Sequence, residues 1–198
     1  MTRRIVDVAV AATTAVLLSP VIVAVAVLVR VSLGRHVLFR QVRVGAAGRE
    51  FSIVKFRTMR PEAWPGEPDA ARDCRTGRAL RASSLDELPQ LWNVIVGDMS
   101  LIGPRPTLPD QVACYSERQR GRLAVRPGLT GWAQVNGRNS ISWPERIELD
   151  LDYIAHRSLR LDVKIVWRTV LMLLHRTGIY GEGGVNQGFP ADGGEVRP

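Results

Sequence analysis

The longest apolar stretch of the chain runs from Ile5 to Val29. Five residues interrupt it: Asp7, Thr13, Thr14, Ser19 and Pro20. A straight helix of this length would measure about 37 Å, which is enough to cross the core of a bilayer. The stretch is too long for the apolar core of a signal peptide. The pattern therefore predicts a retained membrane segment.

A bend is expected near the middle of this stretch, at Ser19-Pro20. Pro20 lacks the N–H group that would bond the carbonyl of Val16. Arginines stand at both ends of the stretch, and positive charge favours the cytoplasmic side of a membrane. The residues alone leave two topologies open: a re-entrant hairpin with both ends on one side, and a spanning helix, which tolerates proline. Single spans of this length are common, which favours the second.

A β-hairpin is predicted next. Residues 37–44 and 49–57 are rich in β-branched and aromatic side chains, and Gly45-Ala46-Ala47-Gly48 joins them. The second arm contains two cations, Lys55 and Arg57, which suit either a bound phosphate or the solvated face of a strand. Prolines and charges over residues 60–71 predict a surface loop.

The stretch over residues 81–90 places an arginine, two hydroxyls and two adjacent carboxylates before an apolar run of helical spacing. A helix start favours bound phosphate, and a carboxylate there can be a metal ligand or a nucleophile. Ser84 and Glu87 also fit a capping box, which stabilises a helix without any chemistry. Pro89 opposes the capping interpretation, because it disfavours helical geometry just before it. The helix is then expected to begin one or two residues later, with Asp86 and Glu87 at its edge.

A rigid turn is expected at Pro104-Arg105-Pro106, because an arginine between two prolines has a stiff, extended backbone. Such a turn suits a preorganised guanidinium group aimed at a phosphate or a base. A plain structural turn fits these residues equally well.

The C-terminal half is predicted to hold three helices. We expect a basic surface helix over residues 111–126, an acidic helix over 141–156 and an amphipathic helix over 162–176, which suits either a core or a membrane surface. Between the first two helices, residues 126–134 are loop-like, with glycines that would let a ligand approach the backbone. The acids of the second helix are expected to form a solvated face rather than a metal site: Glu145, Glu148, Asp150 and Asp152.

The charge of the chain restricts its partners. The chain of 198 residues has a formal net charge of +8, which predicts an anionic partner such as nucleic acid, lipid headgroups or a phosphorylated substrate. Cys74 and Cys114 lack metal-ligand spacing and are expected to be incidental thiols. No Walker loop or dinucleotide fingerprint is present, and the scattered histidines do not support a catalytic triad. Carboxylates, arginines and a membrane segment suit phosphoryl chemistry beside a lipid, which needs a divalent ion.

Taken together, these motifs resemble those of the monotopic phosphoglycosyl transferases, the bacterial sugar transferase family. The matching text runs from Arg4 to about Gly184. It contains Ser19-Pro20, Lys55-Phe56-Arg57-Thr58-Met59, Ser84-Leu85-Asp86-Glu87-Leu88-Pro89-Gln90, Gly97-Asp98-Met99-Ser100-Leu101-Ile102-Gly103-Pro104-Arg105-Pro106 and Arg126-Pro127-Gly128-Leu129-Thr130-Gly131-Trp132. No bundle of spanning helices precedes Arg3, so the resemblance is to the small, single-domain form.

The resemblance implies a reaction in which a phosphosugar moves from a UDP-sugar to polyprenyl phosphate, with Mg²⁺ at the diphosphate. By the same match, Asp86 is the nucleophile and a metal ligand, and Glu87 assists beside it. The phosphate-holding arginine falls on Arg81, and the arginine near the nucleotide on Arg105. Lys55 matches a basic residue near the same site.

The resemblance also implies an architecture. Ser19 and Pro20 become the apex of a re-entrant helix, which reverses the preference for a spanning one. We expect a mostly helical α+β fold, with a membrane anchor over residues 1–34, a catalytic domain over 35–180 and a flexible tail over 181–198. Amphipathic interfacial helices would surround an active site at the cytoplasmic face of the bacterial inner membrane. Membrane lipids are the expected partners, nucleic acid is not, and a homodimer stays open.

Two rival hypotheses need no catalysis. A membrane-anchored binding module would use its basic face on nucleic acid, and a scaffold would use its carboxylates only to cap a helix. Both predict that the change Asp86→Asn has little effect on function, whereas the enzyme hypothesis predicts near-total loss of turnover.

Overall fold

The computed structural model describes residues 2–137 and 140–175. The packing of Cα atoms divides the chain into two compact units. The first unit holds Met1–Gln41 and Ile53–Ile95, and the second holds Val42–Ser52 and Val96–Pro198. Helices predominate over a small number of short strands, which confirms the predicted mostly helical α+β class. The predicted tail over residues 181–198 lies outside the described residues.

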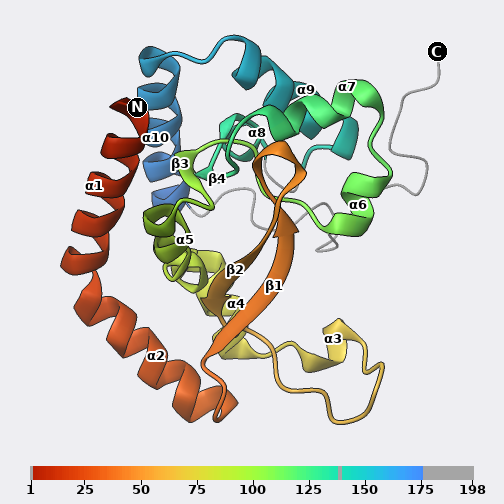
Figure 1. The fold of residues 1–198 in the computed structure, drawn as a ribbon. Helices are drawn as coiled ribbons and strands as arrows, with labels where there is room; N and C mark the ends of the chain where they lie inside the picture. Colours follow the sequence, from red (N-terminus) through yellow and green to blue (C-terminus); the bar gives the residue numbers. More distant parts are fainter. Residues whose placement is uncertain (1, 138–139, 176–198) are drawn as a thin grey trace. The chain divides into compact units, whose positions relative to one another are not determined.

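The apolar N-terminal stretch folds as two helices, α1 (Thr2–Leu17) and α2 (Ser19–Leu33), with a bend of 63° between them (Figure 1). The predicted bend at Ser19-Pro20 is confirmed. Pro20 occupies the first turn of α2, where its missing N–H would have no helical partner in any case. The carbonyl of Val16, which Pro20 leaves without a donor, accepts a hydrogen bond of 2.7 Å from the Ser19 hydroxyl. The Ser-Pro pair therefore creates the bend and also satisfies the carbonyl that the bend exposes.

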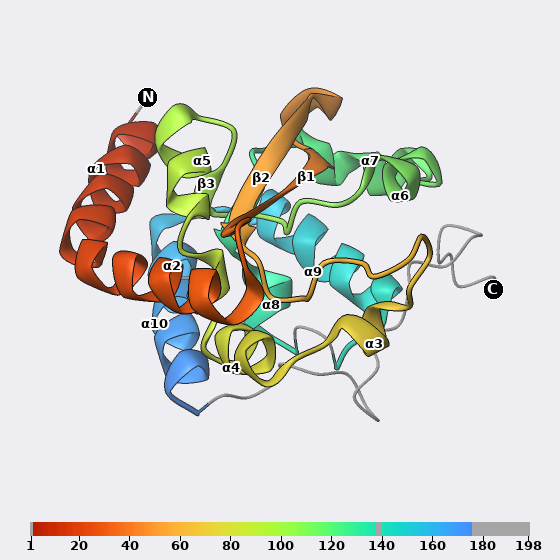
Figure 2. The same ribbon diagram turned by 90° about the horizontal axis from the view of Figure 1, so that it is seen from below.

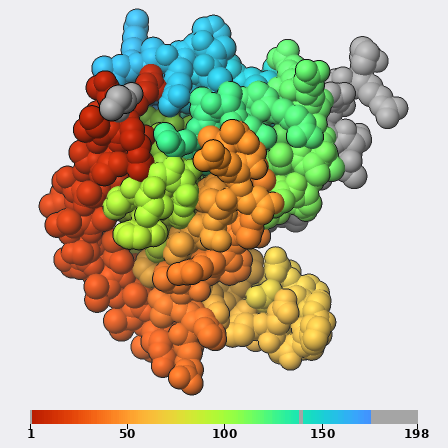
Figure 3. Space-filling model, viewed as in Figure 1, coloured from red at the N-terminus to blue at the C-terminus, as the bar shows by residue number. Residues whose placement is uncertain are grey.

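Across the described ranges, no single helix has both the length and the apolarity needed to cross a membrane. The helices α1 and α2 reach that length and apolarity only together, as a bent pair. Figure 3 shows their atoms as one uninterrupted band, from red to orange. Large apolar side chains are exposed along the pair, among them Val16, Leu17, Val23, Val27 and Val31.

One face of α2 belongs to the core of the first unit. Val25, Val29 and Leu33 recur every fourth residue and are buried with Phe56 and Leu80. Figure 2 shows α2 beside α4 (Arg75–Ser83), the helix that carries Leu80. Each of these fully buried side chains contributes about 1.5–3 kcal/mol.

The predicted hairpin is confirmed as β1 (Leu38–Val44) and β2 (Glu50–Phe56), joined through a short 3-10 turn, η1 (Ala46–Gly48). The predicted surface loop follows and contains only a single helical turn, α3 (Asp69–Arg72). Figure 3 shows this segment, in yellow, as a separate lobe. Glu67 is the buried residue of the loop, and its carboxylate accepts a hydrogen bond of 2.8 Å from the N–H of Ala63.

The second unit contains a small parallel sheet of β3 (Ser100–Ile102) and β4 (Gly128–Thr130), with Ser100 opposite Gly128. A Cβ atom on Gly128 would lie 2.1 Å from the backbone nitrogen of Gly103, and one on Gly131 would lie 2.1 Å from the Gly103 carbonyl oxygen. The predicted role of these glycines is therefore corrected: they admit a neighbouring stretch of the chain's own backbone, not a ligand.

The predicted basic surface helix over residues 111–126 is wrong. That stretch forms short turns, which are α6 (Pro109–Ala113), α7 (Glu117–Arg120) and η3 (Gly121–Ala124). Arg122 within it is buried rather than solvated. The helices that follow are α8 (Trp132–Val135), α9 (Trp143–Ala155) and α10 (Leu159–His175). The acidic and amphipathic helices are confirmed as α9 and α10, and Ser142 and Glu145 form the capping box of α9.

Candidate active site

Asp86 and Glu87 lie in a single 3-10 turn, η2 (Leu85–Glu87), between α4 and α5 (Gln90–Val96). Asp86 is only 5% exposed, and Glu87 is half-buried. The capping hypothesis for Ser84 is wrong, because Ser84 has φ 55° and ψ 16°, the left-handed conformation, and its N–H closes the end of α4 on the carbonyl of Arg81. The α-helix proper begins after Pro89, as the alternative predicted. The two carboxylates therefore lie at a break between two helices.

Arg81 is held at the end of α4 by two neighbours. Its guanidinium group pairs with the carboxylate of Asp73 and donates a hydrogen bond of 3.3 Å to the carbonyl of Thr58. Burial alone would raise the pKa of Asp73, but hydrogen bonds from Arg78 and Arg81 outweigh it, so the pKa lies below its ordinary value. The side chain of Arg81 remains 25% exposed. Arg81 thus has a fixed direction and an accessible edge.

The carbonyl of Thr58 is the point on which α4 rests. A Cβ atom on Gly77 would lie 1.7 Å from this oxygen, so only glycine allows the helix to approach so closely. Cys74 caps the start of α4: its sulfur accepts a hydrogen bond of 3.3 Å from the N–H of Gly77 and lies 3.7 Å from the Thr58 oxygen. Cys74 is therefore a structural cap, where the sequence predicted an incidental thiol.

Lys55 lies on β2, and α5 is tied to that strand at the adjacent residue. The side-chain oxygen of Asn93 on α5 accepts a hydrogen bond of 3.1 Å from the N–H of Val54. The ammonium group of Lys55 lies 5.2 Å from the centre of the Phe39 ring on β1, a cation–π contact. The next residue, Phe56, is in the buried core with Leu80 of α4. Strand, helix and carboxylate turn are thus linked within the first unit.

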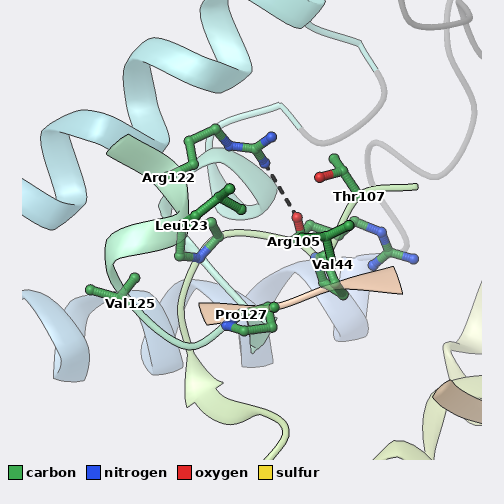
Figure 4. Close-up of a pocket in the computed structure, with 10 residues that line it drawn as sticks. Val44, Arg105, Thr107, Arg122, Leu123, Val125 and Pro127 are labelled. Atoms are coloured by element: carbon green, nitrogen blue, oxygen red, sulfur yellow. Dashed lines mark hydrogen bonds between the residues drawn. The ribbon is translucent and has the colours of Figure 1, made fainter. Parts of the chain in front are cut away.

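Arg105 belongs to the second unit and is exposed. Its carbonyl accepts a hydrogen bond of 3.3 Å from Arg122, and Figure 4 shows Arg122 pointing at that oxygen. The recess between them has a volume of about 10 Å³, room for about one water molecule, so it is not a substrate pocket.

Arg122 and Asp150 form a buried ion pair that sequence reasoning missed. Two guanidinium nitrogens of Arg122 donate to one Asp150 oxygen, over 3.0 and 2.6 Å. Burial raises the pKa of the Asp150 carboxyl, although the charge of Arg122 acts in the opposite direction. Asp150 is 2% exposed, so its predicted place on a solvated face is wrong, whereas Glu145, Glu148 and Asp152 are exposed as predicted.

A further arginine, Arg146, lies one turn before Asp150 on α9. Its Nε donates a hydrogen bond of 3.1 Å to the carbonyl of Ile141, and its guanidinium carbon lies 5.0 Å from the centre of the Trp143 ring. Burial lowers the pKa of Arg146, and the positive charges of Arg105 and Arg122 lower it further. This cluster of positive charges could not be predicted from the sequence, because Arg105, Arg122 and Arg146 are far apart along the chain.

In the parts of the chain that the structure describes, no three His, Cys, Asp or Glu side chains are grouped closely enough to hold a metal ion by themselves.

Comparison with known proteins decides the family. A model described as bacterial sugar transferase matches residues 1–176. The chain belongs to the bacterial sugar transferase family.

Curated relatives of this sugar transferase cover most of its length. The sugar transferase EpsL of Bacillus subtilis is 50% identical over 154 residues, which are 76% of each chain. A UDP-glucose:undecaprenyl-phosphate glucose-1-phosphate transferase of Caulobacter vibrioides is 42% identical over 191 residues, 90% of this chain and 72% of the relative. A protein of the same name from Escherichia coli is 38% identical over 184 residues, but these make up only 39% of that longer chain.

Proposed function

We propose that this sugar transferase moves a sugar phosphate from a UDP-sugar to polyprenyl phosphate, with Asp86 as the nucleophile. The observation that carries the proposal is the position of Asp86 and Glu87 in η2, immediately after the helix whose last turn holds Arg81. Membership of the family and the names of the Caulobacter and Escherichia relatives support the same reaction.

The reaction takes two displacements at one phosphorus atom. In the first, a carboxylate oxygen of Asp86 bonds to the sugar-bearing β-phosphorus, and the bond from that phosphorus to the bridging oxygen breaks, which releases UMP. In the second, a phosphate oxygen of the polyprenyl phosphate bonds to the same phosphorus and expels the Asp86 carboxylate. Charge balances in each step without proton transfer, so neither step requires a general base. Covalent catalysis of this kind lets one site serve two bulky substrates in turn and predicts ping-pong kinetics.

Fixed cations answer the main difficulty of the first step, which is attack by an anion on a diphosphate. Arg81 is oriented by Asp73 and Thr58, and Lys55 by the Phe39 ring. Such groups offset developing charge without reorganising during the reaction. We assign Arg81 and Lys55 to the phosphates and Arg105 to the nucleotide, the roles that the resemblance implies.

We propose Mg²⁺ as the cofactor. Proteins usually hold Mg²⁺ through one or two carboxylates together with substrate phosphates rather than in an all-protein cage. Asp86 and Glu87 offer adjacent carboxylates of this kind, so the donor set fits an ion that arrives with the diphosphate. When bound, the ion would neutralise charge on the diphosphate.

We propose that α1 and α2 form a re-entrant anchor in the cytoplasmic membrane, with the active site on the cytoplasmic face. A soluble helix places polar residues on its outer face, whereas the outer face of α2 exposes Val23, Val27 and Val31. In α10, Val163, Val166 and Trp167 are also exposed, a pattern typical of a helix at a membrane surface. Such an anchor keeps the site at the level of lipid phosphates.

The test is release of UMP by membrane fractions given Mg²⁺, polyprenyl phosphate and a panel of UDP-sugars. Wild-type protein should release UMP with at least one sugar, and without polyprenyl phosphate it should gain the mass of a sugar phosphate on the peptide that contains Asp86. Asp86→Asn should abolish both signals with the fold retained, because the amide has nearly the same size and shape as the carboxylate but is not a nucleophile. Turnover by Asp86→Asn at the wild-type rate would refute the assignment. Salt-sensitive binding of DNA without UMP release would favour the binding-module alternative.

A further inference from the structure

Four hydrogen bonds within the second unit fix the turn that carries Arg105. The carbonyl of Arg105 accepts from Arg122 over 3.3 Å. On the far side of Pro106, the hydroxyl of Thr107 accepts a bond of 3.0 Å from Tyr115, and the carbonyl of Thr107 accepts one of 3.0 Å from the N–H of Val44. Arg122 in turn donates to the hydroxyl oxygen of Tyr115. The turn is therefore held on both sides of its second proline.

Asp150 is the centre of this arrangement because it fixes the guanidinium plane of Arg122. The side chains of both partners are 3% exposed. A buried ion pair adds little net stability compared with well-packed apolar residues, since both charges lose their hydration. The ion pair instead fixes the orientation of Arg122, because a carboxylate that accepts hydrogen bonds from two nitrogens of one guanidinium group restricts the plane of that group. In that orientation, Nη1 of Arg122 donates a hydrogen bond to the hydroxyl oxygen of Tyr115, and Nη2 also donates one to the carbonyl of Arg105.

We propose that the buried Arg122–Asp150 pair, with Tyr115, is a positioning device that fixes the guanidinium group of Arg105 for a bound uridine nucleotide. The proposal rests on the role assigned to Arg105 under the proposed function. None of the three residues touches the nucleotide; they act through the backbone of Arg105. The recess of about 10 Å³ beside Arg122 is too small for any part of a nucleotide, which agrees with an indirect role.

A double-mutant cycle tests this coupling, with the affinity of the full-length protein for UDP measured by calorimetry. Asp150→Asn should weaken UDP binding about tenfold in the wild-type background and less than about twofold in an Arg105→Ala background. A purely structural role predicts equal weakening in both backgrounds, and that result would overturn the proposal. So would UDP binding that is absent in the wild type or indifferent to Arg105→Ala.

A milder variant covers the case in which Asp150→Asn does not fold. Tyr115→Phe keeps the ring, its cation–π contact with Arg122 and the ion pair, and removes the hydroxyl group that donates to Thr107 and accepts from Arg122. It should weaken UDP binding about threefold, again only when Arg105 is present; no loss in the wild-type background would count against the proposal. Glu148→Gln is the matched control, because Glu148 is an exposed acid on α9 that pairs with Arg118 at the surface, and it should leave UDP affinity unchanged.

The binding assay separates the two proposals. UDP binding that depends on Arg105 and Asp150, without UMP release from any UDP-sugar, would refute the proposed function and leave the positioning device standing. UMP release together with additive effects of Asp150→Asn and Arg105→Ala would do the reverse.

Discussion

Replacement of Gly77 by alanine should disturb the candidate site more than any other single methyl group in α4. The added Cβ atom would lie 1.7 Å from the carbonyl oxygen of Thr58 and 2.7 Å from its carbon. Real Cβ contacts essentially never fall below 3.0 Å, so the helix and the carbonyl must move apart by about 1.3 Å. The obstacle is backbone, and no side-chain rotation relieves it.

Two opposing effects set the magnitude. Alanine favours a helix over glycine by about 1 kcal/mol. Overpacking against a rigid neighbour costs about 1–3 kcal/mol, and the shift also breaks the bonds from Cys74 and Arg81 to the Thr58 carbonyl. Strain should therefore win, with a net loss of about 1–2 kcal/mol in the free energy of unfolding. Activity should fall further, by about 10²-fold, because Arg81 and Asp86 follow at the end of the displaced helix.

Denaturant unfolding and UMP release together check this expectation. Gly121→Ala is the matched control, because a Cβ atom there meets only the end of the Leu151 side chain at 3.1 Å, which can rotate away. The control should keep the free energy of unfolding within about 0.5 kcal/mol of wild type and the rate of UMP release within about twofold. A Gly77→Ala variant that is more stable than wild type and fully active would show that α4 does not rest on Thr58.

Two further predictions concern the first unit. Because hydrogen bonds from Arg78 and Arg81 lower the pKa of Asp73, that carboxylate contributes stability above about pH 3.9, which is lost as the pH falls through its lower folded value. Asp73→Asn should remove this loss of stability at acid pH, measured as the urea midpoint against pH, and an unchanged acid dependence would contradict the prediction. The same variant should release Arg81 and so raise the KM for the UDP-sugar. Arg4 donates to the last carbonyls of α5, those of Val94 and Ile95. Arg4→Lys keeps the charge but cannot bridge both oxygens, so it should cost about 1 kcal/mol in unfolding while membrane attachment persists; an unchanged free energy of unfolding would mean that only the charge matters.

Local chemistry explains what the sequence predicted correctly. The bend between α1 and α2 follows from one proline whose missing N–H acts on its own helix. The hairpin follows from β-branched arms around a glycine turn. Pro89 likewise indicated that the helix starts after the carboxylates and not at Ser84. In each case the deciding interaction joins residues that are only a few positions apart, so it can be predicted from the local sequence.

Long-range contacts explain what it missed. Asp150 looked solvated because its neighbours along the helix are acidic, yet it is buried against Arg122, which is 28 residues away. Gly128 and Gly131 indicated a close approach but could not show what approaches, and it is the backbone of Gly103. The resemblance named Asp86 and Arg105, but the bonds that hold Arg105 became visible only in the fold.

The helix α2 is part of the core of the first unit, so the anchor that we propose is not detachable from that unit. Its buried face, with Val25 and Val29, shares one core with Phe56 and Leu80, and Leu85 packs against the same core immediately before Asp86. Burial of such side chains contributes about 1.5–3 kcal/mol each, a large part of the stability of a small unit. The opposite face of α2 is equally apolar and has no such partners in this core, so lipid is the environment that suits it. One helix thus supports the turn of Asp86 on one side and, under the proposed function, meets the bilayer on the other, which would make the distance of Asp86 from the lipid phosphates a property of the fold.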